Sequence, residues 1–133
     1  MRARAPSARL VVVGYPQLVG DPDGAGGIDV ESCPSLVAPL GGGLRVDGNE
    51  VRWLREKGDR LAGVIRAAAT AAGAVYVDSA AAFAGHEACT PEPWVAGIVV
   101  PQVALSFHPN AAGHEAMARL LHPKVEAQLG SDR

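Results

Sequence analysis

The stretch Arg9-Leu-Val-Val-Val-Gly14 is an unbroken apolar, mostly β-branched run that ends at a glycine. A run without polar residues at alternate positions is typical of a strand buried on both faces, as in a parallel sheet. A second short run, Ala74-Val-Tyr-Val-Asp78, has the same character and ends in an acid. The two runs predict two strands of one sheet.

A long helix is predicted between the two strands. Asp47 and Glu50 have the spacing of a capping box, which satisfies free N–H groups at a helix start. Gly58 and Gly63 are expected to allow close packing on the sheet, and Gly73 to end the helix. Apolar residues recur at helical spacing, namely Val51, Leu54, Leu61, Val64, Ile65 and Ala68. The other side is expected to be a solvated charged face, with Arg52, Arg55, Glu56, Asp59, Arg60 and Arg66.

The order strand, helix, strand predicts a right-handed parallel βαβ unit. The carboxyl ends of its strands meet at one edge of the sheet, where ligands bind in open α/β folds. Residues 15–48, before the helix, are rich in Gly, Pro, Asp and Ser, so we expect a long excursion with little regular structure.

Composition restricts the class of protein. The 133 residues allow one domain, and 48% apolar with 20% charged residues is ordinary for a globular protein. A formal net charge of −2 gives no argument for a nucleic-acid partner. We recognise no apolar run long enough for stable membrane insertion and no signal peptide.

The segment Ser106-Phe-His-Pro-Asn-Ala-Ala-Gly-His114 carries the strongest candidate for chemistry. A following proline keeps His108 out of helical backbone, and Asn110 can cap the helix that comes next. A histidine on such a loop can act as a general base near neutral pH. The alternative is a loop histidine without chemistry. The last helix should kink at Pro123 and present one apolar face, with Met117, Leu120, Leu121, Val125 and Leu129.

Cys33 and Cys89 lie in two loop-like segments. A bridge between them would close a long loop, stabilise the fold by roughly 4 kcal/mol and imply an oxidising compartment. Two unpaired thiols in the cytosol are the alternative. The remaining histidines lack the i, i+4 spacing of a zinc helix, so we expect no metal and no cofactor from His86, His114 and His122.

The segment from Ser106 to His114 resembles the last third of the SGNH (GDSL-type) ester hydrolases, and it is most similar to the secreted actinobacterial lipases and esterases. The resemblance extends over nearly the whole chain. It implies that residues 1–133 are the C-terminal portion of a single flavodoxin-like α/β/α sandwich with parallel strands. The other matching residues are Val11-Val-Val-Gly-Tyr-Pro16 as a late strand, Cys33 and Cys89 as a bridge, and Gly85-His-Glu-Ala-Cys89 followed by Trp94-Val-Ala-Gly97.

The resemblance implies a carboxylic ester hydrolase that acts on an ester or lipid. In this family a serine of a Gly-Asp-Ser motif attacks the ester carbonyl, and a C-terminal histidine, matched here by His108, takes its proton. An aspartate often stands three residues before that histidine, where this chain has Leu105. We therefore expect a Ser–His dyad in which the Leu105 backbone carbonyl orients the ring. Trp94 is a candidate for the wall of the substrate pocket.

The chain departs from the family pattern in one further way. It contains no Gly-Asp-Ser, because the nucleophile and oxyanion residues belong to blocks that precede the late strand. Ser79 follows a strand, but the wrong one, and it or Asp78 is expected to cap a short helix. We therefore expect a fragment of a secreted enzyme type that is inactive alone. The alternative is a non-catalytic half-domain that binds a partner chain, or a second copy, through the strand edge Leu10–Val13.

Overall fold

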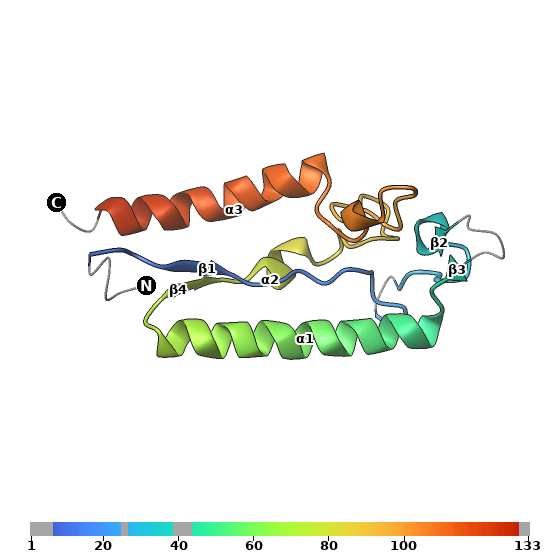
Figure 1. Ribbon diagram of the computed structural model, residues 1–133, viewed down its shortest axis with the longest axis horizontal. Helices are drawn as coiled ribbons and strands as arrows, with labels where there is room; N and C mark the ends of the chain where they lie inside the picture. Colours follow the sequence, from blue (N-terminus) through green and yellow to red (C-terminus); the bar gives the residue numbers. More distant parts are fainter. Residues whose placement is uncertain (1–6, 25–26, 39–43, 131–133) are drawn as a thin grey trace.

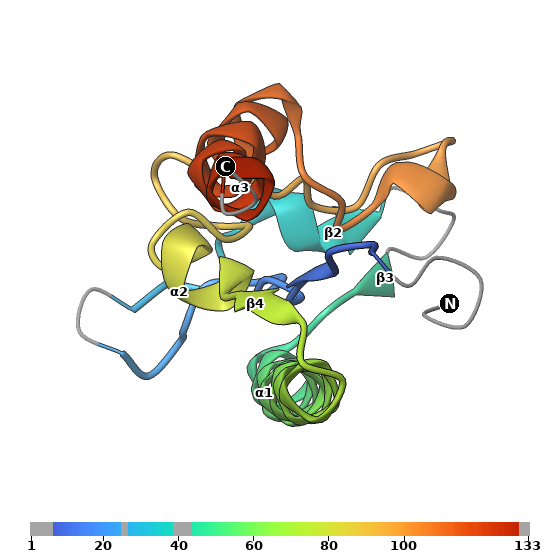
Figure 2. The same cartoon turned by 90° about the vertical axis from the view of Figure 1, so that its left-hand side faces the viewer.

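The computed structural model describes residues 7–24, 27–38 and 44–130. Strands β1 (Val11–Val13) and β4 (Val75–Val77) pair in parallel, as expected. They lie between two long helices, α1 (Gly48–Ala71) and α3 (Ala111–Gly130), which both contact β4 (Figure 1). Figure 2 shows the helices end-on, on opposite sides of the strands. The chain therefore forms part of a three-layer α/β/α fold.

The other elements are short. Helix α2 (Ser79–Phe83) follows β4, and two 3-10 turns cover Pro34–Leu36 and Val103–Leu105. Strands β2 (Val37–Ala38) and β3 (Leu44–Arg45) form a small antiparallel pair. Of the residues between 15 and 48 that the structure describes, few are in regular elements, as the composition predicted.

Both ends of α1 follow the predicted signals. The Asp47 carboxylate accepts from the backbone N–H groups of Asn49 and Glu50, and Glu50 Oε2 accepts from Asp47 N at 2.9 Å. After the helix, Gly73 has a φ of +61° and donates its N–H to Thr70 O at 3.0 Å. Glycine adopts this left-handed conformation at little cost, so it suits the turn that leads into β4.

The expected burial of β1 on both faces is wrong. Each of its three valines is only partly buried. The sheet has two strands within the described part of the chain, so one edge of β1 has no strand beside it. A strand with a neighbour on one side only cannot be covered as fully as the interior strand that its composition predicts.

The apolar face of α1 is also less covered than predicted. Val51 is fully buried, whereas Leu61 and Val64 are 47% and 66% exposed. A Cβ built on Gly63 would meet nothing within 4 Å, so this glycine is not a point of close packing. The apolar end of α3 is similarly open, since Leu129 is 70% exposed, and the helix continues through Pro123.

The described residues form two core clusters. The first consists of Val19, Val30, Cys33, Leu36 and Val51. It contains one end of a disulfide between Cys33 and Cys89, whose Cα atoms are 5.7 Å apart. The bridge ties the irregular segment before α1 to the loop after α2. The second cluster consists of Phe83, Val95 and Ala116, with Trp94 and Met117 packed against it.

None of the helices in the described ranges is long and apolar enough to cross a membrane.

Candidate active site

His108 lies on the loop that leads into α3, and its residue is exposed. The backbone around it is fixed by an antiparallel pairing with an earlier segment. Ala96 N donates to His108 O at 2.9 Å, and Asn110 N donates to Trp94 O at 2.8 Å. The histidine is therefore carried by an anchored backbone, although its side chain reaches solvent.

The residues after His108 attach this loop to α3. The Asn110 side chain accepts from Gly113 N at 3.0 Å and donates from Nδ2 to Pro93 O at 2.7 Å. Asn110 is thus the predicted helix cap, and it also ties the cap to the preceding loop. A Cβ built on Gly113 would lie 2.2 Å from Trp94 O, so only glycine lets the helix approach this carbonyl. The sequence His-Pro-Asn-x-x-Gly therefore describes one packed corner.

A cavity of about 270 Å³ lies beside the histidine. Its wall is formed by Gly14, Tyr15, Pro16, Phe107, His108, Pro109 and Met117. Residues 14–16 directly follow β1, so the cavity lies at the carboxyl end of the sheet, the predicted edge. Apart from the imidazole and the Tyr15 hydroxyl, the side chains of this wall are apolar. The site therefore combines one proton acceptor with a surface suited to a hydrocarbon group.

The Leu105 carbonyl accepts a hydrogen bond from the backbone N–H of His108 at 3.4 Å. Within residues 7–24, 27–38 and 44–130 we find no hydrogen bond to the imidazole itself. The carbonyl is thus next to the histidine, and its predicted action on the ring remains a prediction.

Ser79 is fully buried, and its Oγ donates to Gly14 O at 2.5 Å. The carboxylate of Asp78, and not Ser79, caps α2 by accepting from Ala81 N at 3.1 Å. A buried hydroxyl that already donates to a backbone carbonyl is not placed to attack a substrate. This position agrees with the expectation that Ser79, which follows the wrong strand for the family, is not the nucleophile.

Trp94 contributes its backbone to the site, whereas its ring lies elsewhere. The indole stacks on the His86 imidazole with centroids 3.7 Å apart and meets the Phe83 ring edge-on at 5.3 Å. It is not among the residues that line the cavity beside His108. The role of Trp94 in the wall of a substrate pocket therefore stays a prediction. Within the described ranges, no three or more His, Cys, Asp and Glu side chains gather as a metal would require.

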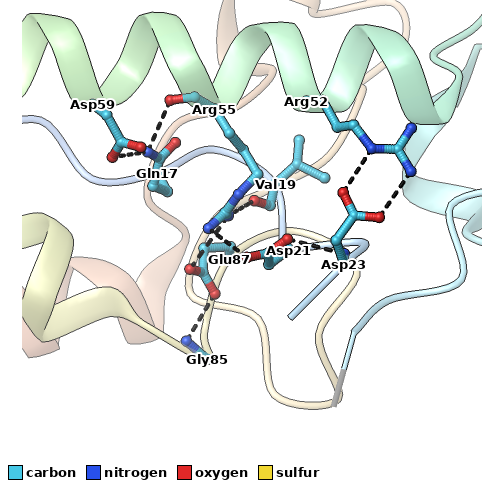
Figure 3. A network of polar contacts seen from close by, with 9 residues as sticks. All are labelled: Gln17, Val19, Asp21, Asp23, Arg52, Arg55, Asp59, Gly85 and Glu87. Atoms are coloured by element: carbon cyan, nitrogen blue, oxygen red, sulfur yellow. Dashed lines mark hydrogen bonds and ion pairs between the residues drawn. The ribbon is translucent and has the colours of Figure 1, made fainter. Parts of the chain in front are cut away.

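A polar network that the sequence did not reveal joins residues 17–23 and the loop after α2 to α1 (Figure 3). Arg55 Nη1 donates to Val19 O at 2.6 Å and lies 3.8 Å from Oε1 of the buried Glu87. Glu87 Oε2 accepts from Gly85 N at 2.8 Å. Arg55 was expected on a solvated face, but it joins three segments. No local signal marks such a residue, because its partners are distant in sequence.

The side chains of Gln17 and Arg52 extend this network. The amide of the buried Gln17 donates to Asp59 Oδ1 at 2.6 Å and to Arg55 O at 3.1 Å. Arg52 forms a two-pronged pair with Asp23, at 2.6 and 2.8 Å, and this hydrogen bonding lowers the pKa of the exposed Asp23 carboxyl. The segment that follows β1 is therefore fastened along α1.

Comparison with known proteins identifies the family to which this architecture belongs. Residues 1–116 match the GDSL-like Lipase/Acylhydrolase family. The chain is similar to Lipase 2 of Streptomyces coelicolor, with 34% identity over 123 residues, which are 89% of this chain and 36% of the relative. It is also similar to a lipase of Streptomyces rimosus, with 30% identity over 113 residues, or 84% of this chain and 35% of the relative.

Two solved structures have the same fold. They are an extracellular lipase from Streptomyces rimosus (TM-score 0.70, 28% identity) and a phospholipase A1 from Streptomyces albidoflavus NA297 (TM-score 0.72, 31% identity). Each likeness covers 92% of this chain and 45% of the solved chain. The chain spans about a third of the length of the two Streptomyces lipases that it matches by sequence. By sequence and by fold, it belongs to the GDSL-like lipase/acylhydrolase family.

Proposed function

We propose that His108 is the general base of a carboxylic ester hydrolase and that this chain supplies the base without the nucleophile. The observation that carries the proposal is the position of an exposed imidazole on the wall of an apolar cavity, at the carboxyl end of a parallel sheet. The serine and the oxyanion donors would come from the part of the domain that precedes the matched region in longer relatives. The 133-residue chain alone is then inert toward esters.

In the assembled site, His108 takes the proton of the attacking serine hydroxyl and later returns it to the leaving alcohol. The Leu105 carbonyl takes the place of an acid by accepting the second ring N–H, which fixes the direction of the imidazole. Its adjacency to the His108 backbone supports this role. The reaction needs no metal or cofactor.

The substrate is an ester with an apolar acyl group, since the side chains of the cavity wall beside His108 are mostly apolar. We also propose that the complete protein is secreted. The Cys33–Cys89 disulfide supports this, because such bridges persist in oxidising compartments. A similar protein from Streptomyces rimosus is described as an extracellular lipase.

The test joins this chain to the segment of Lipase 2 of Streptomyces coelicolor that precedes the region this chain matches, and it measures hydrolysis of p-nitrophenyl butyrate. The joined protein should turn over the ester, and His108→Ala should lower kcat by about 10²- to 10⁴-fold, as expected when a general base is removed. His122→Ala is the matched control, because its side chain is 71% exposed on α3. Equal turnover in His108→Ala and wild type rules out His108 as the base.

A second candidate function is a non-catalytic half-domain that associates through β1. Gly14 N donates to Val77 O and Val75 N donates to Leu10 O, so by alternation the backbone groups of Val13 face the other edge. That edge has no strand beside it in the described residues, and such edges recruit other chains. Light scattering should then show a dimer that Val13→Pro abolishes. A monomeric wild-type protein contradicts this function.

A further inference from the structure

The residue before His108 has an unusual backbone conformation. Phe107 has a φ of +58°, in the left-handed region that bulky L-residues rarely occupy. Glycine is the usual residue where a chain must adopt such a conformation. The presence of phenylalanine here indicates that its ring makes contacts that glycine could not make.

The structure shows what holds this conformation. The Phe107 ring is partly buried and packs against the core cluster that contains Cys33 and Leu36. The Phe107 N–H donates to Gly97 O at 3.2 Å. The same residue also lines the cavity beside His108. Phe107 therefore connects the disulfide-bonded core to the candidate base.

We infer that Phe107 is a positioning residue: its ring, anchored in the disulfide-bonded core cluster, holds the left-handed backbone that keeps the His108 imidazole at the cavity. Without that anchor, the backbone at position 107 relaxes toward negative φ, which redirects the next residue. The importance of this for catalysis rests on the proposed role of His108. The positioning itself is a property of the structure and can be measured without activity.

The test uses NMR of the 133-residue chain. Backbone ¹⁵N relaxation reports the order of His108, and nuclear Overhauser contacts report whether its ring stays against the cavity wall. In Phe107→Gly, which permits the left-handed backbone but lacks the anchor, we expect His108 to become mobile and the ring contacts to disappear. Phe107→Leu retains an apolar anchor, so we expect it to keep both the order of His108 and the contacts of its ring.

Ala69→Gly is the control, because Ala69 is buried on α1, on the side of the strands away from α3. It should lower the melting temperature and leave His108 ordered, which separates positioning from general stability. The inference is overturned if Phe107→Gly keeps the ring contacts or if Ala69→Gly loses them equally. Should Phe107→Gly not fold, the wild-type protein still tests the inference. Its His108 must then be as ordered as α3, and a His108 more mobile than α3 would overturn the inference.

The two proposals can fail separately. If Phe107→Gly loses the ring contacts and His108→Ala keeps full turnover, the inference about Phe107 stands and the proposed role of His108 as the base is refuted. If Phe107→Gly keeps the ring contacts and turnover depends on His108, the inference about Phe107 is refuted and the role of His108 as the base stands.

Discussion

Replacement of Gly113 by alanine tests the packed corner that carries His108. The added methyl group would lie 2.2 Å from Trp94 O and 3.0 Å from Pro109 Cβ. Trp94 O is a backbone atom that also accepts from Asn110 N, so it cannot move without disturbing the loop. Overpacking of this kind costs about 1–3 kcal/mol, whereas alanine gains up to about 1 kcal/mol over glycine as a helix former. With the full helix-forming gain subtracted, the net expectation is a destabilisation of up to about 2 kcal/mol.

Gly63→Ala is the matched control, because it makes the same change inside α1 where an added Cβ meets nothing within 4 Å. Only the helix-forming gain remains there, so this variant should be more stable than the wild type by up to about 1 kcal/mol. The two substitutions therefore have opposite signs. Urea unfolding with the disulfide intact, followed by circular dichroism, measures both. A Gly113→Ala protein as stable as Gly63→Ala would refute the close approach of α3 to Trp94.

Three other predictions follow from single contacts. Asn110→Ala should cost about 1–2 kcal/mol in urea unfolding through the lost cap, while Asn110→Asp keeps the capping oxygen and should cost less; equal losses contradict the cap. Serine at both Cys33 and Cys89 should cost about 4 kcal/mol, from a sequence separation of 56, and an unchanged unfolding midpoint contradicts this. Arg52→Ala should raise the pKa of Asp23 toward its ordinary value, as an NMR titration would show. Because the folded pKa is lowered, the pair stabilises the wild type above the ordinary carboxyl pKa, and this stabilisation is lost as the pH falls through the folded pKa.

Features encoded over a few neighbouring residues could be predicted from the sequence. The capping box at Asp47, the stop at Gly73 and the cap at Asn110 each depend on residues three or four positions apart. The parallel pairing of β1 with β4 followed from the order of elements, since a strand–helix–strand unit allows few other arrangements. The position of His108 at the sheet edge followed in turn.

Features that depend on distant partners could not be predicted. Arg55 looks like one more charge on a solvated face until the fold brings Val19 and Glu87 to it. The contacts of the Trp94 ring with His86 and Phe83 could not be predicted either, because they form only once the loop after α2 has folded. The burial of β1 was overestimated because apolar composition shows that a strand can be buried, whereas the elements that cover it in the described residues are set by the rest of the fold.

The central claim is that the imidazole at position 108 acts on a hydroxyl that residues 1–133 do not supply. A serine-directed fluorophosphonate probe tests it most directly, with the labelled residue located by mass spectrometry in the joined protein. We predict a label on a serine of the added segment, formed at least about 100-fold faster with His108 than with alanine there, in line with the effect of a general base. A label on Ser79, or equal labelling rates in the two proteins, would contradict the claim.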